Sequence, residues 1–174
     1  MSFLSKISLL ISKLCILIGG ICLVSTVSVT LLDIVTRYLY KLTSGGSGFT
    51  VQGSLELIEQ FMFIALMAAF VAFVERSQIV VDIFTQKLPH SVKALLMGFF
   101  VFVFAILGAV FAYGQYELML DAQKYSMTTQ VLRISLVPIH ALGMVLSLFL
   151  MVRAAIESFI IFATGEYHNA EEAS

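Results

Sequence analysis

Residues 94–116 read ALLMGFFVFVFAILGAVFAYGQY and contain no charged side chain. One helix needs about 20 apolar residues to cross a bilayer core of about 30 Å, so this stretch is long enough to span a membrane. Three further apolar stretches, at residues 14–32, 61–74 and 134–152, fill most of the remaining chain. The pattern predicts an all-α integral membrane protein with four transmembrane helices.

The amino-acid composition is typical of a membrane protein. The chain is 60% hydrophobic and 12% charged, whereas a soluble domain is about 45–50% apolar and about 25% charged. The formal net charge of -1 offers no basic field for nucleic acid. We therefore expect the lipid bilayer as surroundings, and a single four-span domain over residues 1–174. Its spans are expected at about 10–40, 54–75, 91–119 and 132–162.

A shorter segment between the second and third spans has a different pattern. Between residues 77 and 88, apolar side chains recur at helical spacing while polar ones fall on the other side. This predicts a short amphipathic helix that lies in the membrane interface. The residues assigned to this interfacial anchor are Ile79, Val80, Asp82, Ile83 and Phe84.

Four charged residues near the ends of the first two spans are candidates for contacts between helices or subunits. Asp33 and Arg37 have the i,i+4 spacing, acid first, that favours an ion pair on one helix. Glu56 and Glu59 open the second span, where acidic residues suit the helix dipole. We expect a contact between Arg37 and Glu56, since unpaired charge is costly in lipid. A cation or proton site is the alternative.

The distribution of Lys and Arg predicts the orientation. Six lie on one side of the expected spans and four on the other, which favours cytoplasmic amino and carboxyl termini. Five tyrosines are expected on the side opposite the termini, where they would form an aromatic belt at the membrane interface. Charged residues on that side could contact a soluble partner or could be solvated loop charges: they are Lys41, Asp121, Lys124 and Arg133.

Residues able to carry chemistry are few. Cys15 and Cys22 are expected to be packed thiols in the first span, and His140 a hydrogen-bonded packing residue rather than a ligand. No HExxH or CxxC motif indicates a metal site, and no nucleophile elbow indicates an esterase. We expect no catalytic residue, no metal and no cofactor, and hence no enzyme.

Two other functions are compatible with a four-helix membrane protein: a channel or exporter, and a membrane enzyme. A self-contained four-helix channel or small exporter needs polar groups at mid-depth. The chain supplies mainly Ser25, Thr26, Ser28 and Thr30, all in the first span. An integral-membrane enzyme needs convergent His, Asp or Cys groups near an interface, and only scattered ones occur.

The polar motifs form a recognisable series. DIVTRY ends the first span at 33–38, GSLEL opens the second at 53–57, and ERSQIVVD follows it at 75–82, with Leu88-Pro89 closing the amphipathic segment. This series resembles the small membrane subunit, often called DctQ-like, of tripartite ATP-independent periplasmic (TRAP) transporters. The resemblance covers nearly the whole chain. The sequence departs from many relatives at Leu55, where they carry a second acid, and at Gln78, where they carry histidine.

The resemblance implies a setting for the chain in the bacterial inner membrane. Its partners are a large DctM-like membrane subunit, which moves substrate by an elevator motion, and a periplasmic substrate-binding protein, which delivers an organic anion. An ion gradient, commonly of sodium, drives uptake. The small subunit itself transports nothing and braces the large one.

Overall fold

Four long helices account for most of the residues that the structure describes. The computed structural model describes residues 3–43, 52–74 and 89–164. Its helices are α1 (Phe3–Leu42), α2 (Ser54–Ala72), α4 (His90–Lys124) and α5 (Val137–Thr164). Each is long and apolar enough to cross a membrane. The prediction of an all-α fold with four membrane helices is confirmed, whereas the amphipathic helix expected at residues 77–88 lies outside the described residues.

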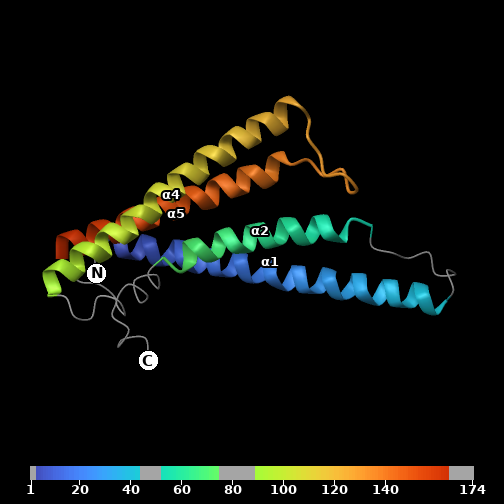
Figure 1. Ribbon diagram of the computed structural model, residues 1–174, viewed down its shortest axis with the longest axis horizontal. Helices are drawn as coiled ribbons and strands as arrows, with labels where there is room; N and C mark the ends of the chain where they lie inside the picture. The colour runs from blue at the N-terminus through green and yellow to red at the C-terminus, as the bar shows by residue number, and fades with distance from the viewer. Residues whose placement is uncertain (1–2, 44–51, 75–88, 165–174) are drawn as a thin grey trace.

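The helices are arranged as two antiparallel pairs. α1 lies along α2, and α4 lies along α5 (Figure 1). The pairs meet at one end and diverge toward the other (Figure 1). We call the meeting end the N-terminal end, because α1 begins there, and the other the loop end, because residues 125–136 connect α4 to α5 there. Contact between the pairs runs mainly through α2 and α5.

The helices differ in length by a factor of two. With a rise of 1.5 Å per residue, the 19 residues of α2 extend about 29 Å, close to the thickness of a bilayer core. The 40 residues of α1 extend about 60 Å, so this helix must tilt or protrude. α4 likewise continues to Lys124, beyond the end expected near residue 119. α5 begins at Val137, later than expected.

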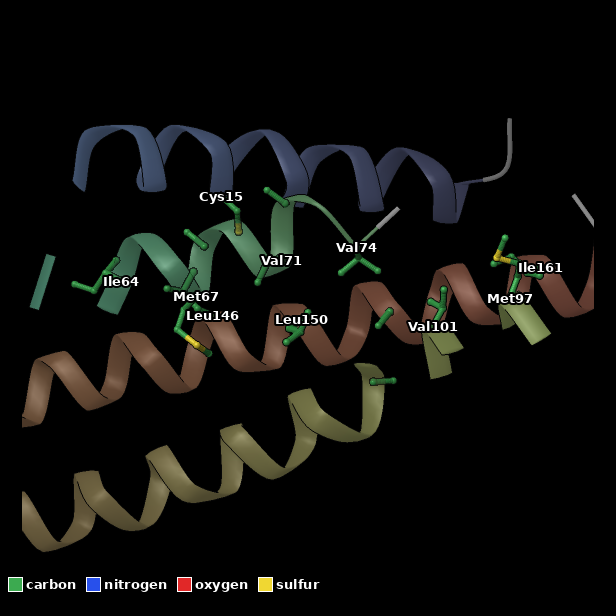
Figure 2. Packing of buried hydrophobic residues seen from close by; sticks show 14 residues of the cluster. Cys15, Ile64, Met67, Val71, Val74, Met97, Val101, Leu146, Leu150 and Ile161 are labelled. Carbon is green, nitrogen blue, oxygen red and sulfur yellow. The ribbon is translucent and has the colours of Figure 1, made fainter. Parts of the chain in front are cut away.

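The apolar core lies where the two pairs meet (Figure 2). Val71 of α2, Val101 of α4 and Leu150 of α5 are at most 2% exposed. Most other large apolar side chains face outward, including a long series on α1 from Leu14 to Leu42. In lipid such faces need no cover, so close packing and interhelical hydrogen bonds, rather than burial from water, hold the bundle together.

Small residues bring α4 and α5 into close contact. A Cβ atom on Gly108 would lie 2.6 Å from the backbone nitrogen of Met151, so only glycine fits there. Among the alanines of α4, Ala105 and Ala112 are buried, whereas Ala109 is exposed. Glycine therefore makes the closest approach between α4 and α5.

Candidate functional site

A buried arginine joins the two helix pairs at the N-terminal end. Arg153 lies on α5 and is fully buried. Its Nε donates a hydrogen bond to Ser8 Oγ at 3.1 Å. One terminal amino group donates to the carbonyl oxygens of Val71 and of Ala72, the latter at 2.7 Å. These carbonyls belong to the last turn of α2, which has no helical N–H partners for them. Arg153 therefore caps α2 from the neighbouring pair.

Two serines of α1 complete this junction. Ser8 accepts from Arg153 and donates to Glu157 Oε1 at 2.9 Å. Ser12 donates to the carbonyl oxygen of Ala72 at 3.2 Å. We call Ser8, Val71, Ala72, Arg153 and Glu157 the arginine clamp. It ties α1, α2 and α5 together through hydrogen bonds, which is how a charge inside a membrane protein is made tolerable.

A glutamate makes the corresponding junction at the loop end. Glu56 lies in the first turn of α2. One carboxylate oxygen accepts the backbone N–H of Val131 at 2.7 Å, and the other accepts that of Leu132 at 3.0 Å. Hydrogen bonds to an ionised acceptor are stronger than neutral ones. We call these three residues the glutamate clamp. It fixes the loop between α4 and α5 to the first turn of α2, which belongs to the other helix pair.

Gly53 makes the close approach of this loop possible. It precedes α2 in a left-handed conformation, with φ 81°, that favours glycine. A Cβ atom there would lie 2.6 Å from Leu132 Cγ. Gly53, and not the neighbouring Ser54, occupies the N-cap position of α2, and Ser54 is buried.

The loop has an internal structure of its own. The backbone N–H of Thr129 donates to the carbonyl of Ile134 at 2.9 Å, and Thr129 Oγ1 accepts the N–H of Ile134 at 3.1 Å. An antiparallel bridge joins Thr128 to Ser135. Arg133, near the tip, has φ 53°, a left-handed conformation uncommon for a residue other than glycine. The loop is thus a small, closed turn and not an open tether.

The ion pair predicted on α1 is present. Arg37 Nε lies 3.0 Å from Asp33 Oδ2. The expected contact between Arg37 and Glu56 does not form among the described residues, because Glu56 is engaged by the loop. These charged residues instead share the wall of an open pocket of about 580 Å³, lined by Asp33, Arg37, Gln52, Gly53, Ser54, Leu55, Glu56, Gln130 and Val131. Glu59, one turn further along α2, is exposed.

The four charged residues considered for docking belong to the last turn of α1, the end of α4 and the loop after α4, and these segments lie at the loop end (Figure 1). Lys41 is in the last turn of α1, and Arg133 is in the loop. Asp121 and Lys124 belong to the end of α4, not to a linker as expected. The side chains of all four are exposed.

Other polar groups in the spans are satisfied by packing partners. His140 Nδ1 lies 2.9 Å from Gln115 Oε1 on the facing helix, which supports the packing interpretation. Cys15 is buried in the core and Cys22 is half-buried; both are free thiols. Among the described residues, no three His, Cys, Asp or Glu side chains form a group that could hold a metal ion.

Three of the four hydroxyl groups on which a pore would rely bond within their own helix. Thr26, Ser28 and Thr30 each donate to the carbonyl four residues earlier, at 2.8–2.9 Å. Such back-bonding satisfies the hydroxyl without a partner helix or water. These groups therefore give little support to a polar conduit.

The arginine clamp was not anticipated from the sequence, where Arg153 was counted only as a charge that orients the chain. A signal was present: Arg153 and Glu157 stand four residues apart in an otherwise apolar span. Charged residues within spans usually find partners inside the protein. The partners on α1 and α2 lie 145 and 82 residues away and could not be identified.

Comparison with protein families gives a clear assignment. Residues 26–164 match the model of the DctQ component of tripartite ATP-independent periplasmic transporters. Neither the curated proteins nor the solved structures contain a match to the chain. The matched segment includes residues 26–42 of α1 and all of α2, α4 and α5, and with them both clamps except Ser8. The chain belongs to the DctQ family, the small membrane components of TRAP transporters.

Proposed function

We propose that this chain is a non-transporting scaffold subunit that braces the large DctM-like subunit of a TRAP transporter for an organic anion. The observation that carries the proposal is the use of polar groups. Arg153, Glu56 and the hydroxyls of Thr26, Ser28 and Thr30 bond to the protein's own backbone. Within the described parts of the four helices, few polar side chains are left to bind a travelling solute, and the two clamps hold the helix pairs at both ends.

The proposed orientation has both termini in the cytoplasm of a bacterium and the loop end at the periplasmic face of the inner membrane. The five exposed tyrosines support a position of the loop end at a membrane interface, and the bias of Lys and Arg supports the choice of the periplasmic face. The tyrosines are Tyr38, Tyr40, Tyr113, Tyr116 and Tyr125.

The proposed mechanism assigns movement to the partner. The long helices α1 and α4 present exposed apolar faces, for example at Leu31 and Phe102, to lipid or to the large subunit. The bundle would stay fixed while the mobile part of the large subunit carries substrate, and an ion gradient, commonly of sodium, would drive uptake. Ile79, Val80, Asp82, Ile83 and Phe84 would add an interfacial anchor.

The loop end is the proposed contact for the periplasmic substrate-binding protein. Lys41, Asp121, Lys124 and Arg133 are exposed at this end and supply charges of both signs. Rim charges of this kind affect association rate and specificity more than affinity. Reversal of Lys124 and Arg133 should therefore slow docking in low salt, and unchanged docking would indicate solvated loop charges.

Co-purification tests the scaffold proposal. The tagged chain, expressed with a DctM-like large subunit, should retain that subunit through detergent extraction. Ile83→Asp should weaken this retention by removing an apolar side chain of the interfacial anchor, whereas Gln86→Asp, on the polar side of the same segment, should not. Failure of the native chain to retain any large subunit, together with conductance of the purified chain, would favour a self-contained channel or exporter.

A further inference from the structure

The loop between α4 and α5 is more strongly organised than an exposed connection requires. Its backbone is held by the glutamate clamp, by the paired hydrogen bonds of Thr129 and Ile134, and by the close seat of Leu132 on Gly53. A connection that only joins two membrane helices needs none of these. Ordered loops with unusual backbone conformations are often shaped for a partner.

We propose that Glu56 is a positioning residue. Its carboxylate sets the shape of the loop and thereby presents Val131, Arg133 and Ile134 as one surface to the periplasmic partner. The inference rests on the proposed docking at the loop end and adds the residue that controls it. Glu56 itself acts through the backbone of Val131 and Leu132 and need not touch the partner.

The surface that the loop presents fits a protein better than a lipid headgroup layer. Val131 is 55% exposed and Ile134 41% exposed, on either side of the exposed Arg133. Arg133 is the one formal charge among residues 125–136. A single cation contributes only about 1 kcal/mol toward an anionic membrane. Arginine beside exposed apolar side chains is typical of protein interfaces. The expected partner surface is an apolar patch with an adjacent carboxylate.

The variants separate the shape of the loop from its chemistry. Glu56→Gln replaces one accepting oxygen by an amide that cannot accept, so one of the two loop N–H groups loses its partner. Glu59→Gln is the matched control, because it removes an exposed carboxylate from the next turn of the same helix. Arg133→Asn removes the charge but keeps a residue that tolerates the left-handed conformation.

Two measurements are made on the complex of this chain and the large subunit in lipid nanodiscs. Backbone amide exchange at residues 131 and 132 reports the shape of the loop. Affinity for the purified binding protein reports docking. Glu56→Gln should speed exchange by about tenfold through the lost charge-assisted bond, and should weaken docking by about as much. Arg133→Asn should weaken docking with exchange unchanged, and Glu59→Gln should change neither.

The outcomes distinguish this inference from the proposed function. Unchanged exchange in Glu56→Gln overturns the inference, and so does faster exchange with docking at the native affinity. If the native complex itself fails to bind the soluble protein, the proposed docking role fails and Glu56 has nothing to position. Retention of the large subunit is measured in every variant, so that loss of assembly cannot be mistaken for loss of docking.

Discussion

The two ends of α2 are held by opposite charges from opposite directions. At its start, the carboxylate of Glu56 reaches out from α2 and accepts backbone N–H groups of the α4–α5 loop. At its end, the guanidinium of Arg153 reaches in from α5 and donates to backbone carbonyls. Both charges suit the helix dipole, the anion near the N-terminus and the cation near the C-terminus. At each end of α2, the shortest of the four described helices, a charged side chain therefore links the two helix pairs through hydrogen bonds to backbone groups.

The two clamps differ in burial, and we expect this to divide their tasks. Arg153 is fully buried within the junction of three helices, so its loss exposes a gap and orphaned carbonyls inside the protein. Glu56 is only half-buried, so its loss leaves N–H groups that water or lipid headgroups can reach. The arginine clamp should therefore govern stability, and the glutamate clamp should govern the shape of a surface.

The largest expected effect is at Arg153. Arg153→Met keeps an apolar stem but leaves the carbonyls of Val71 and Ala72 without their donor. We expect a loss of about 2–4 kcal/mol in unfolding free energy, as for removal of one partner from a buried charged hydrogen bond. Helical content during denaturant titration measures it. Lys13→Met, which removes an exposed cation of α1, is the control. Equal stability of the two variants would contradict the division of tasks.

Packing inside one helix pair offers a second comparison. Gly108→Ala forces a methyl group against the backbone of Met151 and should cost about 1–3 kcal/mol by overpacking. Gly114→Ala lies on the same helix with nothing within 4 Å of its Cβ, so it should be neutral or stabilise by up to about 1 kcal/mol. Thermal unfolding followed by circular dichroism reads both. If Gly108→Ala were as stable as Gly114→Ala, the close contact of α4 with α5 would not be required.

At the loop end, Gly53→Ala should lower stability by less than the change at Arg153. Gly53→Ala meets both a left-handed backbone and the side chain of Leu132, with an expected cost of about 1–2 kcal/mol. Adding Leu132→Ala removes the steric part, so the double variant should lose less than the two single changes combined. A double-mutant cycle on unfolding free energy measures the difference. Strict additivity would mean that Leu132 does not rest on Gly53.

The smallest effect is expected for the hydroxyl groups of α1 that bond to their own helix, those of Thr26, Ser28 and Thr30. Ser28→Ala removes a hydroxyl that is bonded to its own helix and exposed, so stability should change by less than about 0.5 kcal/mol. Substrate uptake by the assembled transporter should also stay unchanged. A marked loss of uptake with normal assembly would revive the interpretation of this face as part of a conduit.

The sequence was sufficient for the helices because apolar length is a local property. Residues 94–116 predict a membrane span without reference to any other part of the chain. The Asp33–Arg37 pair was predictable for the same reason, since its partners are four residues apart. Helix ends were less accurate, as with Lys124 and Val137, because polar residues continue a helix into the interface as readily as they leave it.

The clamps could not be predicted because their partners are backbone atoms far away in the sequence. Glu56 was expected to meet the charge of Arg37, yet it binds N–H groups 75 and 76 residues further on. Every residue carries such groups, so no side-chain pattern marks the chosen ones. The glycine of GSLEL is similar, because nothing in the local sequence indicates that Leu132 lies against it.

Reconstitution tests the central claim most directly, namely that this chain supports transport without carrying substrate. Liposomes are prepared with this chain alone, with the large subunit alone and with both, each in the presence of the binding protein, an ion gradient and a radiolabelled organic anion. We predict uptake only where both membrane subunits are present, and none with this chain alone. Accumulation of the anion by liposomes that contain only this chain would contradict the account.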